Sequence, residues 1–308
     1  MKKIQWKGTL ELLLAAQVLA VGCGPAQEFH EPPALASQIQ EIDGISTNNG
    51  LSTNGLSTNG LSTNGLSTNG LSTNGVNTAA FTTWFQGDPA QNDTLMQYVV
   101  RCGVQKGQSI TYTDPTTARV YTWEGLLGLT PGWAGGTAAT EAEQQVMTAC
   151  LLAHVNKYGV SVPLSVLGRN SAGVEIDYSQ EELELYSRLE GCFFGNLFTS
   201  EGLFVGADSR GLDDTESSPR ACALMSSTTE SACAPVAYVG SCESLCTRQG
   251  TQPYYTSCTL NGRQYLPITT RLRPEEVYRC GDGVCQWTEQ CGSGTTRDSC
   301  AADCGTCS

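Results

Sequence analysis

The 308-residue chain has few charged side chains, few cations and no long apolar segment. Charged residues make up 15% of the sequence, and 30 acidic against 17 basic side chains give a formal net charge of -13. A chain with so little positive charge cannot neutralise phosphates, which excludes a nucleic-acid binder. No uncharged apolar run reaches the ~18 residues that a membrane-spanning helix needs, which excludes a polytopic membrane protein.

The sequence also lacks most motifs that mark an active site. It contains no H-E-x-x-H, no P-loop, no G-x-S-x-G and no G-x-G-x-x-G after a strand. Of its two histidines, His30 precedes the folded part, so a Ser-His-Asp hydrolase has only His154 to use. His154 follows Cys150 by one turn on the apolar stripe of an expected helix, and we expect a packed core histidine there.

A secreted hydrolase that uses His154 or a carboxylate pair remains the alternative to a non-catalytic role. The densest loop cluster of acids is Asp213, Asp214 and Glu216, which we expect to be solvated. Tyr121, Trp123 and Trp133 lie near Gly-rich turns and form either an aromatic binding surface or part of the core.

The N-terminus is typical of an export signal, here residues 1–22. Three lysines precede an apolar stretch that ends at Gly22. The segment LAVGC, which ends at Cys23, resembles the lipobox of bacterial lipoproteins. That resemblance implies cleavage before Cys23 and lipidation of Cys23. The membrane is then a partner, to which the acyl chains anchor the protein. Gly24, in place of an Asp retention signal, implies the outer membrane or cell surface; plain secretion is the alternative.

Residues 23–78 are predicted to form a low-complexity spacer. They contain five perfect copies of LSTNG at 51–75, after the degenerate copy ISTNNG at 45–50. Asn54 stands where a pentapeptide-repeat β-helix needs a small apolar residue, and a buried Asn needs hydrogen-bond partners. We therefore expect a flexible stalk, with a chain of successive Asn-Gly turns as the alternative.

Fourteen cysteines follow Cys23 and separate into two even groups. The first group is Cys102, Cys150, Cys192, Cys222, Cys233, Cys242, Cys246 and Cys258; the second is Cys280, Cys285, Cys291, Cys300, Cys304 and Cys307. Export to an oxidising compartment makes two separate disulfide sets the expected use of these groups. A zinc site at Cys304 and Cys307 is the alternative, without a nearby His. The sequence leaves the pairing open.

Residues 279–308 are too few to bury a core, so disulfides must replace one. The run CGDGVCQWTEQCGSGTTRDSCAADCGTC resembles the small Cys-rich modules that end many secreted myxobacterial proteins. Its interleaved acids are Asp282, Glu289, Asp298 and Asp303. Carboxylates on tight loops suit Ca²⁺, but we expect solvated loop acids and no cofactor, with calcium as the alternative.

Residues 79–278 are predicted to form a disulfide-bonded α+β domain. We expect about three helices, at 92–104, at 140–158 behind the capping box of Thr140 and Glu143, and at 179–191. Short strands are expected at 108–113, 119–123, 160–167, 192–198, 203–206, 235–240, 254–259 and 263–270, the last two joined by Asn261-Gly262. Helices and strands do not alternate regularly, which argues against a parallel doubly wound sheet.

As a whole, the chain resembles myxobacterial surface lipoproteins. The resemblance rests on the lipobox, the LSTNG tract, the stretch EAEQQVMTACLLAHVNKYG and the CGDGxC tail. It implies an exported surface protein and carries no catalytic residue across. The expected function is a binding or structural role in the envelope, with an envelope or extracellular protein or a glycan as partner.

Overall fold

The computed structural model describes residues 46–49, 73–155, 162–199, 201–208, 220 and 236–273, together with residues 281, 285, 289, 291–293 and 299–307 near the C-terminus. The chain divides into two units, residues 1–40 and 41–308, and all described residues belong to the second. Within the described residues, no helix has the length and apolar character required to cross a bilayer.

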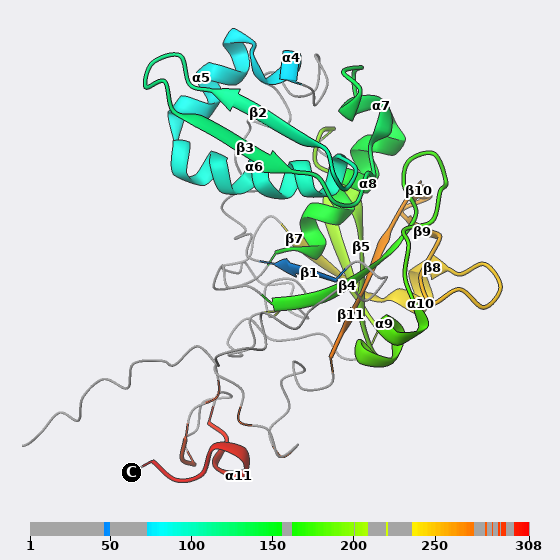
Figure 1. Ribbon diagram of the computed structural model, residues 1–308. Helices are drawn as coiled ribbons and strands as arrows, with labels where there is room; N and C mark the ends of the chain where they lie inside the picture. The colour runs from blue at the N-terminus through cyan, green and yellow to red at the C-terminus, as the bar shows by residue number, and fades with distance from the viewer. Residues whose placement is uncertain are drawn as a thin grey trace, which may run out of the picture. The chain divides into compact units, whose positions relative to one another are not determined.

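A six-stranded mixed sheet lies at the centre of the fold (Figure 1). Its strands, in spatial order, are β1 (Ser46–Asn49), β4 (Val162–Gly168), β11 (Ile268–Leu272), β5 (Arg188–Asn196), β6 (Gly202–Ala207) and β7 (Val236–Ser241). Neighbours are antiparallel except for the parallel pair β6 and β7. Edge strand β1 comes from the degenerate repeat at 45–50, within the range predicted as a spacer.

The two faces of this sheet bury different side chains because successive residues of a strand point to opposite sides. On β5, Phe193 faces one side, whereas Cys192 and Phe194 face the other. On β6, Val205 and Phe204 divide in the same way. The sheet therefore separates two hydrophobic cores, which we call the first core and the second core.

The first core comprises the buried apolar side chains of the β2–β3 hairpin, α5, α6, α8 and the facing side of the sheet, among them Phe85, Trp123, Val146 and Phe193. These elements are α5 (Ala79–Gly87), α6 (Pro89–Gly103), β2 (Ser109–Thr113), β3 (Val120–Glu124) and α8 (Glu141–Ala153), with the short α4 (Thr73–Val76) and α7 (Pro131–Ala134) beside them. The predicted hairpin is confirmed, since β2 and β3 pair antiparallel.

Local sequence explains where the helices of this layer begin. Thr78 accepts a hydrogen bond from the Phe81 backbone N–H and caps α5. The capping box predicted for α8 is confirmed, because Thr140 accepts from Glu143 N–H and the Glu143 carboxylate accepts from Thr140 N–H. Asp88 caps α6 by accepting a hydrogen bond from the Gln91 backbone N–H.

The second core lies on the opposite side of the sheet. Its buried members are Cys192, Phe194, Cys242, Cys246, Tyr255, Cys258 and Tyr265. It is covered by a three-stranded sheet of β10 (Arg263–Tyr265), β9 (Ser257–Leu260) and β8 (Cys246–Thr247), together with α10 (Cys242–Leu245). The predicted turn at Asn261-Gly262 is confirmed, because both residues have positive φ, 51° and 78°, as a type I′ hairpin requires.

The described bridges pair cysteines within each predicted group. Cys102–Cys150 joins α6 to α8, Cys192–Cys242 joins β5 to α10, and Cys246–Cys258 joins β8 to β9. Near the C-terminus, beside α11 (Ala301–Cys304), the bridges are Cys285–Cys304 and Cys291–Cys307, and Cys300 is also disulfide-bonded. Cys222, Cys233 and Cys280 lie outside the described residues.

Two predicted helices end earlier in the structure than expected. Helix α8 stops at Ala153 and not at 158, because the His154 N–H turns back to the carbonyls of Leu151 and Leu152. Helix α9 (Gln180–Leu185) was expected to continue to 191, but residues 188–196 form β5. Pairing of β5 with both β6 and β11 outweighs the helical pattern of its first residues. Helix α5 was not predicted.

A buried ion pair connects β5 to the end of α8. Glu190 occupies a β-bulge, and both its oxygens bind Arg220, at 2.6 and 3.1 Å. Arg220 also donates to the Val155 carbonyl at 2.6 Å, and Thr270 donates to Glu190 at 2.5 Å. The guanidinium lies over the Phe193 ring. Each charge is therefore matched, as a buried ion pair requires.

Candidate functional site

His154, the residue on which a hydrolase depends, is fully buried. Its Nδ1 lies 2.7 Å from the Cys150 carbonyl oxygen, and its ring packs against Tyr98 beside the Cys102–Cys150 bridge. Burial lowers the pKa of His154 to about 4, so the imidazole is neutral at pH 7. With no exposed surface, this ring cannot reach a substrate.

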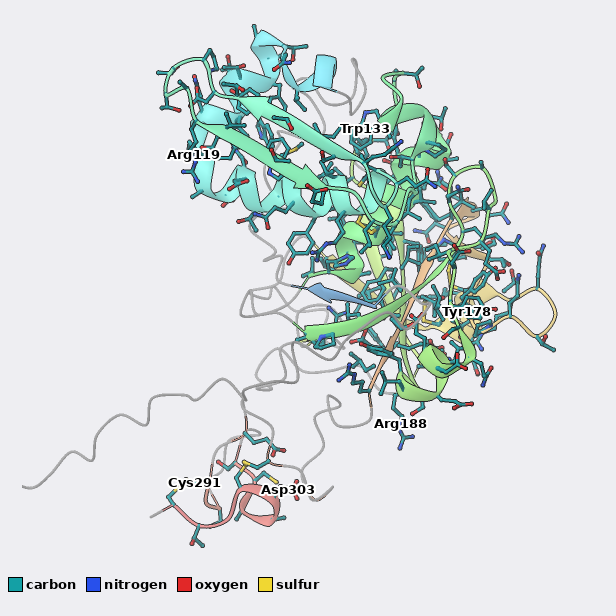
Figure 2. All side chains as sticks on the ribbon, viewed as in Figure 1. Arg119, Trp133, Tyr178, Arg188, Cys291 and Asp303 are labelled. Atoms are coloured by element: carbon teal, nitrogen blue, oxygen red, sulfur yellow. A yellow bond between two sulfur atoms is a disulfide. The ribbon has the colours of Figure 1, made fainter. Side chains whose placement is uncertain are left out.

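The three aromatic residues considered for a binding surface belong to the first core. Tyr121, Trp123 and Trp133 are 7%, 2% and 0% exposed. Trp133, labelled in Figure 2, belongs to α7, and its ring meets Phe198 edge to face. The Trp123 indole N–H donates to Asp93 at 2.7 Å. The interpretation as an aromatic binding surface is therefore wrong, and core packing is the use of these rings.

Two of the four acids considered for calcium, Glu289 and Asp303, come together in the C-terminal region. Asp303 is labelled in Figure 2. Carboxylate oxygens of Glu289 and Asp303 lie within 4.8 Å of each other and of Cys300 Sγ. Asp303 also accepts the Gly281 backbone N–H at 2.5 Å, which gives it a structural role. Asp282 and Asp298 lie outside the described residues.

The alternative of a zinc site at Cys304 and Cys307 is wrong, because both cysteines form disulfides. Cys304 is bonded to Cys285, and Cys307 is bonded to Cys291. A zinc ligand is a thiolate, and a sulfur held in a disulfide cannot supply one. Cys23 and the acids Asp213, Asp214 and Glu216 also lie outside the described residues, so lipidation and a carboxylate pair there stay predictions.

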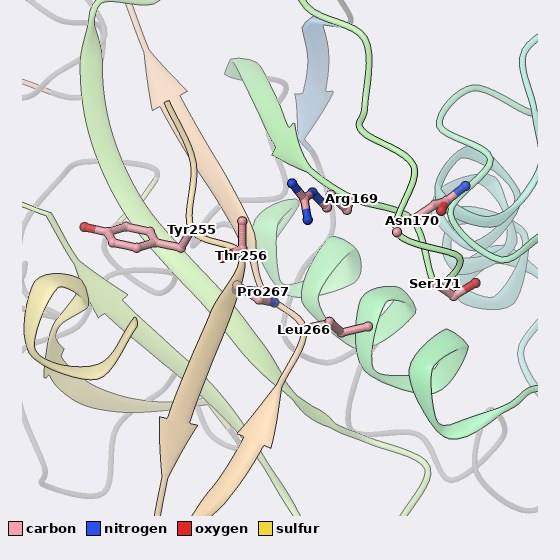
Figure 3. Close-up of a pocket in the computed structure, with 8 residues that line it drawn as sticks. Arg169, Asn170, Ser171, Tyr255, Thr256, Leu266 and Pro267 are labelled. Carbon is pink, nitrogen blue, oxygen red and sulfur yellow. The ribbon is translucent and has the colours of Figure 1, made fainter. Parts of the chain in front are cut away.

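A cavity of about 160 Å³ lies between the loop after β4, the start of β9 and the β10–β11 connection (Figure 3). Its lining residues are Arg169, Asn170, Ser171, Gly173, Tyr255, Thr256, Leu266 and Pro267. Leu266 and Pro267 form an apolar part, and Arg169 is the cation among these residues. In Figure 3 the Tyr255 ring points away from Arg169.

Arg169 carries its charge into this cavity without an ion pair among the described residues. Its Nε donates to the Tyr254 hydroxyl at 3.3 Å, and its Nη2 donates to Gln252 Oε1 at 3.4 Å. The loop beyond it is rigid, because Asn170 Oδ1 accepts backbone N–H groups of Ala172 and Val174, both at 2.9 Å. The arrangement can hold one small anionic group next to an apolar surface.

Two consecutive tyrosines, Tyr254 and Tyr255, fix the segment beside the cavity through hydrogen bonds of their hydroxyl groups. Tyr254 donates to Glu175 at 2.6 Å, and Tyr255 donates to Asp208 at 2.5 Å on the other side of the same segment. Burial and these hydrogen bonds raise the pKa of each phenol to about 12. Both tyrosines therefore keep their protons at neutral pH and act as structural donors, not as general bases.

Comparison with known proteins identifies one tract. A family model described as the GLTT repeat matches residues 50–77 in six copies, so the chain contains a repeat region. No curated protein and no solved structure matches the chain. With a period of five from Gly50, the last copy begins at Gly75; its Val76 is fully buried in the first core, and Thr78 caps α5. The end of the repeat tract therefore packs with the folded domain.

No motif or spacing in the sequence predicted the cavity. Arg169, Tyr254 and Leu266 are far apart in the chain and belong to no motif. The segment at 168–173 forms a turn that the Asn170 hydrogen bonds hold. Only the pairing of β11 with β4 brings that turn next to the β10–β11 connection.

Proposed function

We propose that this chain is an exported, lipid-anchored envelope protein whose folded domain has a non-catalytic binding or structural role. The observation that carries the proposal is the number of bridges in the described residues, including three in the central domain. Disulfides form and persist outside the cytosol. Their presence supports the export that the N-terminal lipobox implies.

The geometry around His154 supports the non-catalytic role over the hydrolase. A general base must come within hydrogen-bond reach of the substrate. His154 is enclosed between the Cys102–Cys150 bridge and Tyr98, and its low pKa comes from that enclosure. The ring fits a core histidine that packs two helices together.

The Arg169 cavity offers the domain a place to bind. Its volume suits one small group of a larger partner, such as a carboxylate on an envelope protein or glycan. Arg169 has no ion pair among the described residues, so its charge favours an anionic group over a cationic one at this cavity.

Membrane attachment is the part of the proposal that is tested most simply. Replacing Cys23 with Ser removes the sulfur that the acyl chains need, so we expect the Cys23→Ser chain to leave the membrane fraction. Ala20 stands where lipoboxes more often have Leu, which makes Ala20→Leu the matched control that keeps the anchor. Immunodetection in membrane and soluble fractions of the native host provides the readout. Equal membrane retention of both variants would refute lipid anchoring.

A further inference from the structure

Two disulfides touch each other in the second core. Cys192–Cys242 joins the central sheet to α10, and Cys246–Cys258 joins β8 to β9. The Sγ atoms of Cys192 and Cys246, which belong to different bridges, are 3.5 Å apart. The Sγ atoms of Cys192, Cys246 and Cys258 all lie within 4.8 Å of one another. Sulfurs of two bridges are therefore at the separation from which a reaction between them can begin.

Packing holds these sulfurs together. Cys246 and Cys258 are directly opposite residues of β8 and β9. Gly206, on the neighbouring strand β6, leaves the room that the other bridge needs: a Cβ there would lie 2.8 Å from Cys192 Sγ and 3.1 Å from Cys242 Sγ. The three clustered sulfurs of Cys192, Cys246 and Cys258 therefore come from three separate strands, β5, β8 and β9, whose pairing and packing bring them together.

We propose that these two bridges form a thiol–disulfide exchange site whose substrate is a dithiol. Of the four cysteines, Cys246 is 7% exposed and the other three are fully buried, so an external thiolate reaches the Cys246–Cys258 bridge first. The thiolate attacks Cys246 Sγ and Cys258 leaves as a thiol. The second thiol of the substrate then closes on the first and releases Cys246.

The second step takes place inside the protein. The Cys246 thiolate attacks Cys192 Sγ, the Cys192–Cys246 bond forms, the Cys192–Cys242 bond breaks, and Cys242 leaves and takes up the proton. In total the dithiol is oxidised to a cyclic disulfide. The protein gains two electrons and two protons, which appear as the thiols of Cys242 and Cys258.

This exchange changes what the bridges connect. In the oxidised protein, Cys242 fixes the start of α10, at the end of edge strand β7, to β5. After exchange, β5 is tied to β8 instead, and the β7–α10 corner is released. The site therefore converts contact with a dithiol into a local change at one edge of the central sheet. It does not require the lipid anchor or the Arg169 cavity.

Limited reduction of the full chain tests the exchange directly. The oxidised protein is treated with one equivalent of dithiothreitol, quenched with an alkylating agent at intervals and digested for mass spectrometry. We expect a Cys192–Cys246 cross-linked peptide that accumulates together with alkylated Cys242 and Cys258. Alkylated Cys246 and Cys258 beside an intact Cys192–Cys242 bridge, or loss of both bridges without the new one, would overturn the proposal.

A pair of double variants provides an independent test. In Cys242→Ser/Cys258→Ser, the remaining sulfurs are the two in contact, so we expect a Cys192–Cys246 bridge and no free thiol at these positions. In the matched control Cys192→Ser/Cys246→Ser, we expect Cys242 and Cys258 to remain as two alkylatable thiols. Equal thiol counts in the two variants contradict the proposal. If either variant does not fold, the limited reduction of the unmodified chain still decides the question.

Discussion

Both cores of this domain consist of buried side chains, but the first is mainly aliphatic and aromatic, whereas the second is rich in disulfide-bonded cysteines. In the first core, two of 34 buried members are cysteines, and the rest are aliphatic and aromatic side chains from several helices and strands. In the second, four of seven are cysteines. Side-chain burial supplies stability in proportion to apolar area. A layer made of short strands and one helical turn has little such area, and bridges compensate for it.

The difference extends to the polar groups beside each core. The first core has a matched ion pair, Arg220 with Glu190, and a neutral buried histidine. The second core has tyrosines that reach out to carboxylates at its margin, such as Tyr255 with Asp208. A large core can enclose polar groups completely, whereas a small one must keep them near its edge. This contrast predicts that the two cores respond differently to the loss of a disulfide, a charge or a small side chain.

Removing one bridge from each core should give the largest effects. The bridges Cys102–Cys150 and Cys192–Cys242 close loops of nearly equal length, with separations of 48 and 50 residues. The loop-entropy term is therefore the same, about 4 kcal/mol of unfolding free energy for each Cys→Ala pair. We expect the loss at Cys192 and Cys242 to remove amide protection selectively from β8–β10.

The variant of the first core should instead lower protection evenly, because its apolar neighbours hold the layer together. Hydrogen exchange by mass spectrometry distinguishes the two patterns, and denaturant midpoints give the free energies. Identical patterns in both variants contradict the contrast between the cores.

Breaking the buried ion pair between Arg220 and Glu190 should lower the free energy of unfolding by a similar amount. Arg220→Met leaves the Glu190 carboxylate buried without its cation, and we expect a loss of about 3–5 kcal/mol. The control is Arg263→Met, because the Arg263 side chain is 44% exposed and its ion-pair partners Glu141 and Glu201 are 64% and 19% exposed. We expect less than about 1 kcal/mol there. Chemical denaturation measures the free energy of unfolding of both variants. Similar losses in the two variants would show that burial does not determine the contribution of an ion pair.

Stability should also depend on pH through His154. In the unfolded chain this histidine binds a proton below about pH 6.5, but the native chain does not bind one until about pH 4. Stability is therefore complete above pH 6.5 and falls by roughly 3 kcal/mol as the pH drops to 4. His154→Gln should lose that part of the slope. A denaturation series from pH 7 to pH 4 with an unchanged slope in the variant contradicts the assignment.

A smaller effect is expected at Gly206. An added methyl group would meet Cys192 Sγ at 2.8 Å, so Gly206→Ala must displace the bridge and cost about 1–3 kcal/mol. Gly87→Ala is the control, because nothing lies within 4 Å of a Cβ at the end of α5. Thermal melting compares the two. Equal melting temperatures would indicate that the second core accommodates the added methyl group. That result would contradict a core whose packing is fixed by its disulfides.

The smallest effect concerns calcium and the C-terminal region. Asp303 already accepts the Gly281 N–H, so we expect chelation of calcium to leave hydrogen exchange of residues 279–308 unchanged. The exchange rates with calcium and with EGTA give the result. Calcium-dependent protection would instead assign Glu289 and Asp303 to a metal site.

Local signals predicted much of the fold, and long-range pairing accounts for the rest. The capping box at Thr140, the Asn261-Gly262 turn and the β2–β3 hairpin depend on neighbours in sequence, and the structure confirms them. The extension of α9 was wrong because β5 gains two sheet partners that no local pattern reveals. Disulfide partners are long-range in the same sense.

The candidate site could not be predicted at all. Arg169 is one of several arginines and belongs to no motif. Its place in the cavity depends on hydrogen bonds to Tyr254 and Gln252, which are more than 80 residues away in the sequence. The status of His154 was predictable, because its place one turn after Cys150 put it on a buried helical stripe. Helical periodicity therefore predicted the burial of His154. It could not predict which residues line the cavity, because these come from distant parts of the chain.

The claim that sulfur replaces apolar area in the second core is tested most directly on protein isolated from its native envelope. A thiol titration combined with a mass-spectrometric disulfide map should find Cys192–Cys242 and Cys246–Cys258 intact and no reactive thiol at these positions. Free thiols at all four cysteines, in protein whose β8–β10 amides remain protected from exchange, would contradict the claim.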